Sequence, residues 1–200
     1  AANGYYGLSA LDPAVGGAIQ YAYDYTVYEP EGSGSGAAPA YLNLHGWGGN
    51  TYAPLTTDPE AYNWEAYKVY PIDQDETWYF GFAQSHDYRL NTQPPAGNTI
   101  VNYTEYRVLR MIYDLIRNPP GRAVDSNRLF VWGHSMGGSG TLALALRYPN
   151  VFAAAYASQP MTDYASSAMW LGDIEPKWGA TALNLPVSII GPGTWAASLQ

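Results

Sequence analysis

The sequence predicts an α/β fold built on a largely parallel sheet. Segments of strand character alternate with segments of helical character along most of the chain, after an initial pair of strands. The 200 residues are 47% hydrophobic, which is enough for one domain with a substantial core. We therefore expect residues 1–200 to form a single domain, since no internal repeat or low-complexity segment interrupts them.

The first half of the chain contains three predicted strands. Residues 18–28 alternate tyrosine and valine with smaller or polar residues, which indicates a half-buried strand. Residues 40–46, AYLNLHG, read as a strand that enters a glycine-rich loop, and residues 77–83, TWYFGFA, read as a buried strand. Residues 51–76 are polar and aromatic without a clear period, so we expect them to be mostly loop.

The second half of the chain begins with a predicted helix. Apolar residues from Val101 to Ile116 recur at helical spacing, and the prolines at 119 and 120 stop that helix. A short strand over residues 128–132 leads into a helix over residues 136–148. Residues 152–158 and 185–190 are predicted to be two further buried strands.

The charge balance and the cysteine count exclude several classes of function. The formal net charge is −8 with nine Lys and Arg, which argues against a nucleic-acid partner and a polybasic membrane anchor. No run of eighteen apolar residues occurs, so we expect no membrane span. The absence of cysteine excludes disulfides, thiolate metal sites and a cysteine nucleophile. Three scattered histidines do not make a zinc site, and we expect neither a metal nor a cofactor.

Three smaller features of the sequence bear on function. The acidic segment PIDQDETW, residues 71–78, lacks the spacing of a calcium-binding loop, so we interpret it as a solvated turn. The N-terminal segment AANGYYGLSALDP has neither an initiator methionine nor a basic-then-apolar leader, and we interpret it as a processed or trimmed end. The 19 Tyr and 7 Trp suit either a core with long loops or a polymer-binding cleft.

The segment LFVWGHSMGGSG, residues 129–140, frames a serine with glycines. Gly133 and Gly137 stand two residues on either side of Ser135, between a predicted strand and a predicted helix. A serine on such a sharp turn has a strained backbone that only small neighbours allow, and its hydroxyl is held above the sheet as a nucleophile. The alternative is that Ser135 only caps the helix, as serines often do.

A second glycine-rich segment, LHGWGG, lies at the end of the strand predicted over residues 40–46. Acyl transfer needs two N–H donors that converge on one oxygen, and the loss of one donor costs roughly 3 kcal/mol of barrier. We assign the N–H groups of Trp47 and Met136 to this oxyanion hole. The alternative is an ordinary glycine turn, which is disfavoured by its position one strand–helix–strand unit upstream of Ser135.

Together these segments resemble the α/β-hydrolase superfamily, and in particular its extracellular esterases: polyhydroxyalkanoate depolymerases, feruloyl and acetylxylan esterases, and esterase D-like enzymes. The resemblance lies in AYLNLHGWGGN, YTEYRVLRMIYDLI and VDSNRLFVWGHSMGGSGTLALALRYPNVFAAAYAS, and it covers residues 18–160. It implies a three-layer sandwich, a structural role for Asp125 and Arg128, and secretion to the bacterial periplasm or outside. The implied activity is carboxylic ester hydrolysis through an acyl-enzyme on Ser135, with polysaccharide-linked acyl groups or a polyester as substrate.

The resemblance does not identify a residue of this sequence as the general base. In the family the acid and the histidine follow the serine along the chain, but none of the three histidines lies after Ser135. We therefore expect the chain to lack the C-terminal third of the fold. The missing residues would lie in a longer chain or in a bound C-terminal fragment of the same enzyme. A degenerate hydrolase that binds without cleaving is the remaining interpretation.

The histidines and acids that are present carry other expectations. His45 is expected to support the shape of the glycine-rich loop, and His134 to pack in the cleft wall. His86 is expected to face the cleft, so His86 and His134 are candidate substrate-binding residues; His86 as the base would break the family's chain order. Asp163 and Asp173 are the candidate acids, although we expect both on solvated loops.

Two other functions share these motifs. One is a non-catalytic binding or structural subunit on a hydrolase scaffold, and the other is a serine peptidase of the prolyl oligopeptidase type. An Asp and a His after the last strands would favour the enzyme, and their absence would favour the non-catalytic scaffold. Substrate profiling would separate an esterase from a peptidase.

Overall fold

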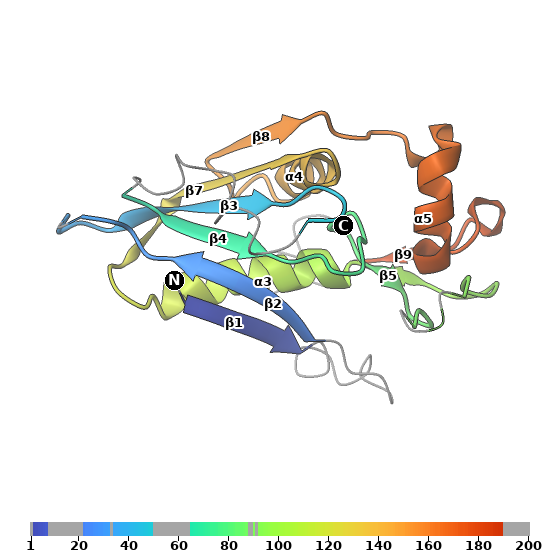
Figure 1. The fold of residues 1–200 in the computed structure, drawn as a ribbon, viewed down its shortest axis with the longest axis horizontal. Coiled ribbons are helices and arrows are strands. Elements are labelled where there is room, and N and C mark those ends of the chain that lie inside the picture. The colour runs from blue at the N-terminus through green and yellow to red at the C-terminus, as the bar shows by residue number, and fades with distance from the viewer. Residues whose placement is uncertain are drawn as a thin grey trace.

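The computed structural model describes residues 2–7, 22–32, 34–49, 65–87, 90 and 92–189. The largest element is a six-stranded sheet with the strand order β1-β2-β4-β3-β7-β8 (Figure 1). Its strands are Ala2–Gly7 (β1), Ala22–Tyr28 (β2), Ala38–Leu44 (β3), Tyr67–Pro71 (β4), Val124–His134 (β7) and Ala154–Ser158 (β8).

Strand direction divides this sheet into two parts. β1 pairs antiparallel with β2, and β2 pairs antiparallel with β4. The neighbours β4 and β3, β3 and β7, and β7 and β8 all pair in parallel. The mainly parallel sheet confirms the predicted α/β class.

The α-helices of the described residues are Tyr103–Arg117 (α3), Met136–Arg147 (α4) and Ala168–Trp178 (α5). The apolar spacing correctly predicted α3, whose Val108, Leu109 and Ile112 are buried. α4 packs on β7 and β8 and provides the crossover that two parallel neighbours require. α5 was not predicted, because its buried face is narrow and it contains Pro176.

A second, smaller sheet holds Phe82–Ala83 (β5), Ile100–Val101 (β6) and Val187–Ser188 (β9), in the order β5-β6-β9. This sheet and α5 stand beyond the arrowheads of β3, β4 and β7 in Figure 1. They therefore lie on the side where the parallel strands end. In α/β sheets, ligands bind outside the carboxyl ends of the strands, so a ligand site is expected on this side.

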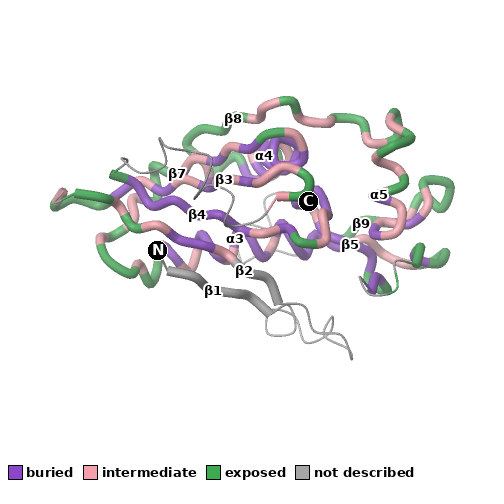
Figure 2. Tube along the Cα trace, in the orientation of Figure 1, coloured by how far each residue is buried: buried purple, intermediate pink, exposed green. Residues whose placement is uncertain are grey.

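The core lies along the central strands. β3 alternates buried and half-buried residues, and every residue of β4 is buried, as Figure 2 shows by the continuous purple trace. β4 has both edges paired, because β2 and β3 flank it. The prediction of loop over residues 51–76 was therefore wrong for β4, because Lys68 and Pro71 made this buried strand look like a loop in the sequence. Residues 51–64 lie outside the described residues.

The strand predicted over residues 77–83 was wrong except for β5. Trp78 and Tyr79 have φ angles of 57° and 59°, which is left-handed backbone that no strand contains. The burial predicted for this segment is confirmed for Trp78, Tyr79 and Phe82. The segment is a buried turn, and aromatic burial alone does not distinguish such a turn from a strand.

The two late strands are exposed, not buried as predicted. In β8, which forms one edge of the described sheet, Ala154, Ala155 and Tyr156 are exposed (Figure 2). β9 is two exposed residues in the small sheet. β1 was not predicted at all, and residues 18–21 of the first predicted strand lie outside the described residues. Within the described ranges, no helix is both long and apolar enough to cross a membrane.

Candidate active site

Ser135 occupies the sharp turn between β7 and α4. Its φ of 57° and ψ of −118° are a conformation that side chains rarely adopt. A Cβ added to Gly137 would overlap the carbonyl oxygen of Leu44, and one added to Gly133 would lie 2.8 Å from the same oxygen. The turn therefore presses against the end of β3, and glycine at both positions is what makes this contact sterically allowed.

The hydroxyl of Ser135 is not used to cap α4. Ser135 stands at the N-cap position, but its side chain makes no capping hydrogen bond. The backbone of the turn is held instead by Ser135 N–H donating to the Ser158 carbonyl at 2.9 Å and by Ser139 N–H donating to the Ser135 carbonyl at 2.9 Å. The simple capping interpretation is therefore wrong, and Ser135 itself is half-buried.

The glycine-rich loop after β3 lies against this turn. A Cβ added to Gly46 would be 4.0 Å from Cβ of Ser135 and 3.6 Å from the carbonyl oxygen of His134. Gly49 N–H donates to the Gly46 carbonyl at 3.0 Å and closes a tight turn around Trp47 and Gly48. The first N–H groups of a helix have no partner four residues back, so Met136 N–H at the start of α4 has no acceptor within the helix.

His45 is built into the base of that loop. Its Nε2 accepts a 2.8 Å hydrogen bond from Asp73 N–H, so its Nδ1 carries the proton and donates to the Gly46 carbonyl at 2.7 Å. The backbone N–H of His45 donates to the Tyr79 hydroxyl at 2.8 Å. Burial lowers the pKa of His45 below its ordinary value, which keeps the ring neutral. His45 supports the loop, as the sequence predicted.

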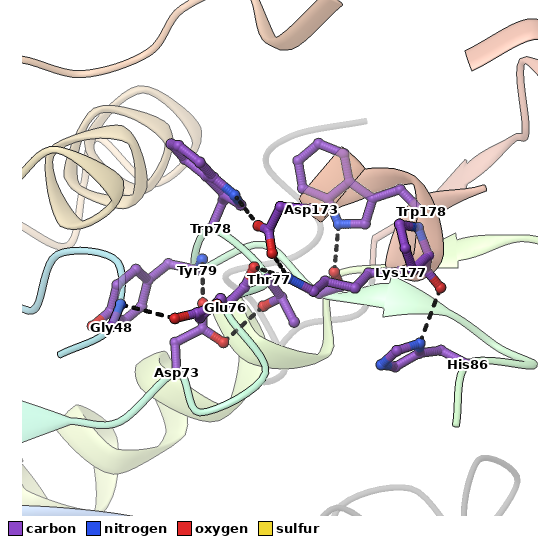
Figure 3. Close-up of polar contacts among 12 residues, drawn as sticks. Gly48, Asp73, Glu76, Thr77, Trp78, Tyr79, His86, Asp173, Lys177 and Trp178 are labelled. Atoms are coloured by element: carbon purple, nitrogen blue, oxygen red, sulfur yellow. Dashed lines mark hydrogen bonds and ion pairs between the residues drawn. The ribbon is translucent and has the colours of Figure 1, made fainter. Parts of the chain in front are cut away.

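The acidic segment 71–78 is structural and partly buried, so its interpretation as a solvated turn was wrong. Asp73 is fully buried. Its carboxylate accepts hydrogen bonds from the Thr77 hydroxyl at 3.0 Å and from Tyr79 N–H at 2.9 Å (Figure 3). These bonds fold the segment back on itself, and the Asp73 N–H then reaches His45.

Glu76 joins this segment to the glycine-rich loop and to α5. Its Oε1 accepts a 2.8 Å hydrogen bond from Gly48 N–H, and its carbonyl oxygen accepts one of 3.0 Å from Nζ of Lys177 (Figure 3). Lys177 also pairs with Asp173 at 2.7 Å. Sequence reasoning missed Glu76 and Lys177. The spacing of Asp173 and Lys177, one helical turn apart, was the available signal for α5.

An aromatic cluster borders the glycine-rich loop on the α5 side. The ring of Trp47 is half exposed, at 52%, and its centroid lies 5.9 Å from that of Trp170 on α5. Trp170 lies 5.1 Å from Trp78, which lies 5.2 Å from Tyr164. Tyr164 also forms part of the wall of a cavity of about 220 Å³ between α5 and residues 179–185.

The structure separates the other predicted site residues. His134 is exposed, and its Nδ1 lies 3.0 Å from the Ser158 hydroxyl. His86 is buried; its Nδ1 donates to the Pro176 carbonyl at 3.2 Å, and burial lowers its pKa. No hydrogen bond between described residues joins any of the three histidines to the Ser135 hydroxyl. These contacts therefore place none of the three histidines as the general base of Ser135.

The candidate acids also have other partners. Asp173 is on α5, where it accepts from Nε1 of Trp78 at 3.2 Å and pairs with Lys177, so its expected place on a solvated loop was wrong. Asp163 is exposed and accepts from Ala165 N–H at 3.0 Å. Asp125 pairs with Arg128 at 2.7 Å, and Arg128 donates to the Ala37 carbonyl, which fits their expected structural role. The described residues contain no group of three His, Asp or Glu that could hold a metal ion.

A mainly parallel sheet, with a glycine-framed serine where one parallel strand turns into a helix, defines an α/β-hydrolase. The chain belongs to the Esterase family, described as "Putative esterase", whose family model matches residues 17–185. No curated protein sequence matches the chain significantly.

Solved structures of low sequence identity share the fold. An S-formylglutathione hydrolase from Agrobacterium tumefaciens is 18% identical, with a TM-score of 0.62 over 90% of this chain and 66% of that one. The fluorophosphonate-binding serine hydrolase F of Staphylococcus aureus is 20% identical, with a TM-score of 0.52 over 78% of this chain and 56% of that one. An S-formylglutathione hydrolase of Staphylococcus aureus is 16% identical, with a TM-score of 0.53 over 98% and 92%. The chain therefore spans less than two thirds of two of these three proteins.

Proposed function

We propose that this protein is a serine-dependent carboxylic ester hydrolase with Ser135 as its nucleophile. Ser135 Oγ attacks the ester carbonyl carbon, and the N–H groups of Trp47 and Met136 hold the oxygen that becomes negative. The alcohol leaves, and water then hydrolyses the acyl-enzyme on Ser135. The general base is a histidine outside these 200 residues, oriented by an acid, in the same chain or in a bound C-terminal fragment.

The single observation that carries the proposal is the backbone conformation of Ser135. A φ of 57° at a β7–α4 turn pressed against the end of β3 costs stability, and such strain persists at functional sites. The contact of Gly46 with the turn supports the assignment of the oxyanion donors, because it brings the loop of Trp47 beside Ser135. The family membership supports the choice of an ester over other acyl substrates.

For the substrate, we propose an acyl group linked to a polysaccharide, or a polyester. The half-exposed Trp47 and its contact with Trp170 support this choice, because an exposed aromatic surface beside a nucleophile suits a sugar ring or an extended apolar chain. Such polymers do not enter cells, so the proposal includes secretion.

The test is turnover of p-nitrophenyl acetate by the native protein, by Ser135→Ala and by Ser139→Ala. The nearby Ser139 is the control for disturbance of the turn itself, because its hydroxyl accepts from Met161 N–H at 2.8 Å and donates to the Ser135 carbonyl at 3.2 Å. We expect Ser135→Ala to fall to the uncatalysed rate and Ser139→Ala to retain turnover. Unchanged turnover in Ser135→Ala would remove the assignment.

The absence of a base around Ser135 in the described residues favours one second candidate, a binding subunit that does not cleave. The denatured intact mass of the native material separates the two. A species well above 21.8 kDa, with turnover that depends on Ser135, supports the enzyme. A lone species of 21.8 kDa that binds acylated polysaccharide without hydrolysing it supports the binding subunit.

A further inference from the structure

The loop that carries Trp47 is closed by the hydrogen bond from Gly49 N–H to the Gly46 carbonyl and supported at its base by His45, but its tip is exposed. Three of its residues, Gly46, Gly48 and Gly49, lack side chains, and Gly48 has a φ of 72°. Gly48 and Trp47 are also exposed, so neither is held by burial. Glycine-rich backbone of this kind loses more conformational freedom on ordering than any other. An oxyanion donor on this loop therefore depends on contacts from elsewhere.

Glu76 provides such a contact at the residue after Trp47. Its carboxylate accepts the Gly48 N–H at 2.8 Å, which is a charge-assisted hydrogen bond when the carboxylate is ionised. The peptide group of this bond joins Trp47 to Gly48, so the bond restrains the plane directly beside the Trp47 N–H. Burial raises the pKa of Glu76, while the Gly48 N–H and Lys177 act in the opposite direction.

Glu76 is itself anchored to α5. Its backbone is left-handed, with a φ of 51°, and its carbonyl oxygen accepts a hydrogen bond from Nζ of Lys177 at 3.0 Å. Lys177 is only 8% exposed, and its second partner is Asp173, one turn earlier in the helix. Figure 3 shows Asp173 and Lys177 on α5 above the segment that carries Glu76, with Gly48 at its other side.

We propose that Glu76 is the positioning residue of the oxyanion loop and that α5 holds Glu76 in place through Lys177. This inference rests on the proposed function. The chain of contacts runs from α5 through Lys177 to the Glu76 backbone, and from the Glu76 carboxylate to Gly48 N–H. A preorganised donor needs no rearrangement as the oxyanion forms, so the contribution of Glu76 falls on the transition state.

The experiment compares Glu76→Ala and Glu76→Gln with Glu175→Ala. Gln keeps a carbonyl oxygen that can accept the Gly48 N–H, whereas Ala removes the acceptor. Glu175 is the matched control, because its carboxylate also lies on the α5 side of the molecule but accepts from Thr181 and Gln93. Two readouts are taken: kcat and KM on p-nitrophenyl acetate, and amide hydrogen exchange of Gly48 by NMR.

We expect kcat of Glu76→Ala to fall at least about tenfold with KM within about twofold, because the lost interaction acts in the transition state. Glu76→Gln should keep kcat within about threefold, since the acceptor remains. Exchange of the Gly48 amide should be at least about tenfold faster in Glu76→Ala alone, as expected for a locally opened loop.

The inference is overturned if Glu76→Ala keeps its kcat in a protein whose turnover depends on Ser135. It is equally overturned if Gly48 exchange is the same in the parent protein and in Glu76→Ala. Loss of kcat in Glu76→Gln as well would assign the effect to charge and not to positioning. If the parent protein has no turnover that depends on Ser135, the proposed function has failed, and the exchange of Gly48 alone decides whether Glu76 holds the loop.

Discussion

The backbone N–H of Asp73 donates to Nε2 of His45 at 2.8 Å, and this bond ties the acidic segment to the glycine-rich loop. Because an N–H group can only donate, Nε2 must be unprotonated, and the proton of the neutral ring sits on Nδ1. Nδ1 then donates to the Gly46 carbonyl at 2.7 Å. One neutral imidazole thus holds two segments whose sequence positions differ by 28 residues.

Acid is expected to weaken this arrangement through His45. Burial lowers its pKa below the ordinary 6.5, so the unfolded chain binds a proton that the folded chain resists. The stabilisation is complete above the unfolded pKa of 6.5 and is lost as the pH falls through the lower folded pKa.

His45→Gln removes this titration, so its unfolding free energy should fall less than that of the parent protein between about pH 7.5 and about pH 5.5. Urea unfolding at the two pH values measures the difference. His86, whose pKa is also lowered, still titrates in both proteins and cancels in the comparison. An equal fall in both proteins would show that His45 does not carry the effect.

Gly137→Ala should destabilise the protein strongly. The new Cβ would overlap the carbonyl oxygen of Leu44, which belongs to a central strand and cannot move away cheaply. We expect a loss of about 3 kcal/mol or failure to fold. The control is Gly172→Ala in α5, where a Cβ meets nothing within 4 Å. That variant should gain up to about 1 kcal/mol from helix propensity. Urea unfolding compares the pair, and equal stabilities would contradict the packed turn.

Removal of the buried carboxylate of Glu105 should also destabilise the fold. Glu105 is fully buried and accepts from Asn102 at 3.0 Å, Tyr148 at 2.9 Å and Arg147 at 2.9 Å. Glu105→Ala leaves these donors without their acceptor, and we expect a loss of about 3 kcal/mol.

A matched control for Glu105 is Asp114→Ala on the same helix. Asp114 also pairs with an arginine, Arg110, but both side chains are about one third exposed. Its removal should change stability by less than about 1 kcal/mol, because water screens such pairs. Denaturant unfolding compares the two variants, and a larger loss in Asp114→Ala would contradict the assigned role of the buried network.

The variant Trp47→Ala tests the role of the Trp47 side chain without removing its backbone N–H. The N–H remains, so kcat on p-nitrophenyl acetate should stay within about twofold. The exposed indole is lost, so KM on acetylated xylan should rise about fivefold, as expected for the loss of one aromatic contact. Tyr156→Ala, which removes an aromatic residue of 67% exposure from β8, should change neither constant. Equal losses on both substrates would assign Trp47 to the shape of the loop.

The parts that could be predicted from the sequence are the local ones. The Ser135 turn was found because Gly133 and Gly137 flank the serine in the chain, and α3 was found because its apolar spacing repeats within the helix. β4 could not be recognised, because its central place in the sheet is set by pairing with β2 and β3 and not by a pattern in its own sequence. The strand propensity of a segment does not reveal contacts with parts of the chain that are distant in sequence.

The supporting network of the site could not be predicted for the same reason. Glu76 lies 28 residues from Gly48 and 101 residues from Lys177, so no local pattern connects the three. Trp78 and Tyr79 looked like strand residues because they are aromatic and buried. Their backbone is left-handed instead, and Tyr79 N–H donates to the carboxylate of Asp73, six residues earlier in the chain.

The role of Ser135 as nucleophile is tested most directly by locating a covalent adduct. The native protein is treated with a fluorophosphonate, which reacts with activated serines, and the modified peptide is sequenced by mass spectrometry. We predict one adduct, on Ser135, that is absent in Ser135→Ala and retained in Ser139→Ala. An adduct on Ser139 or another serine, or equal labelling of Ser135→Ala and the parent protein, would contradict the account.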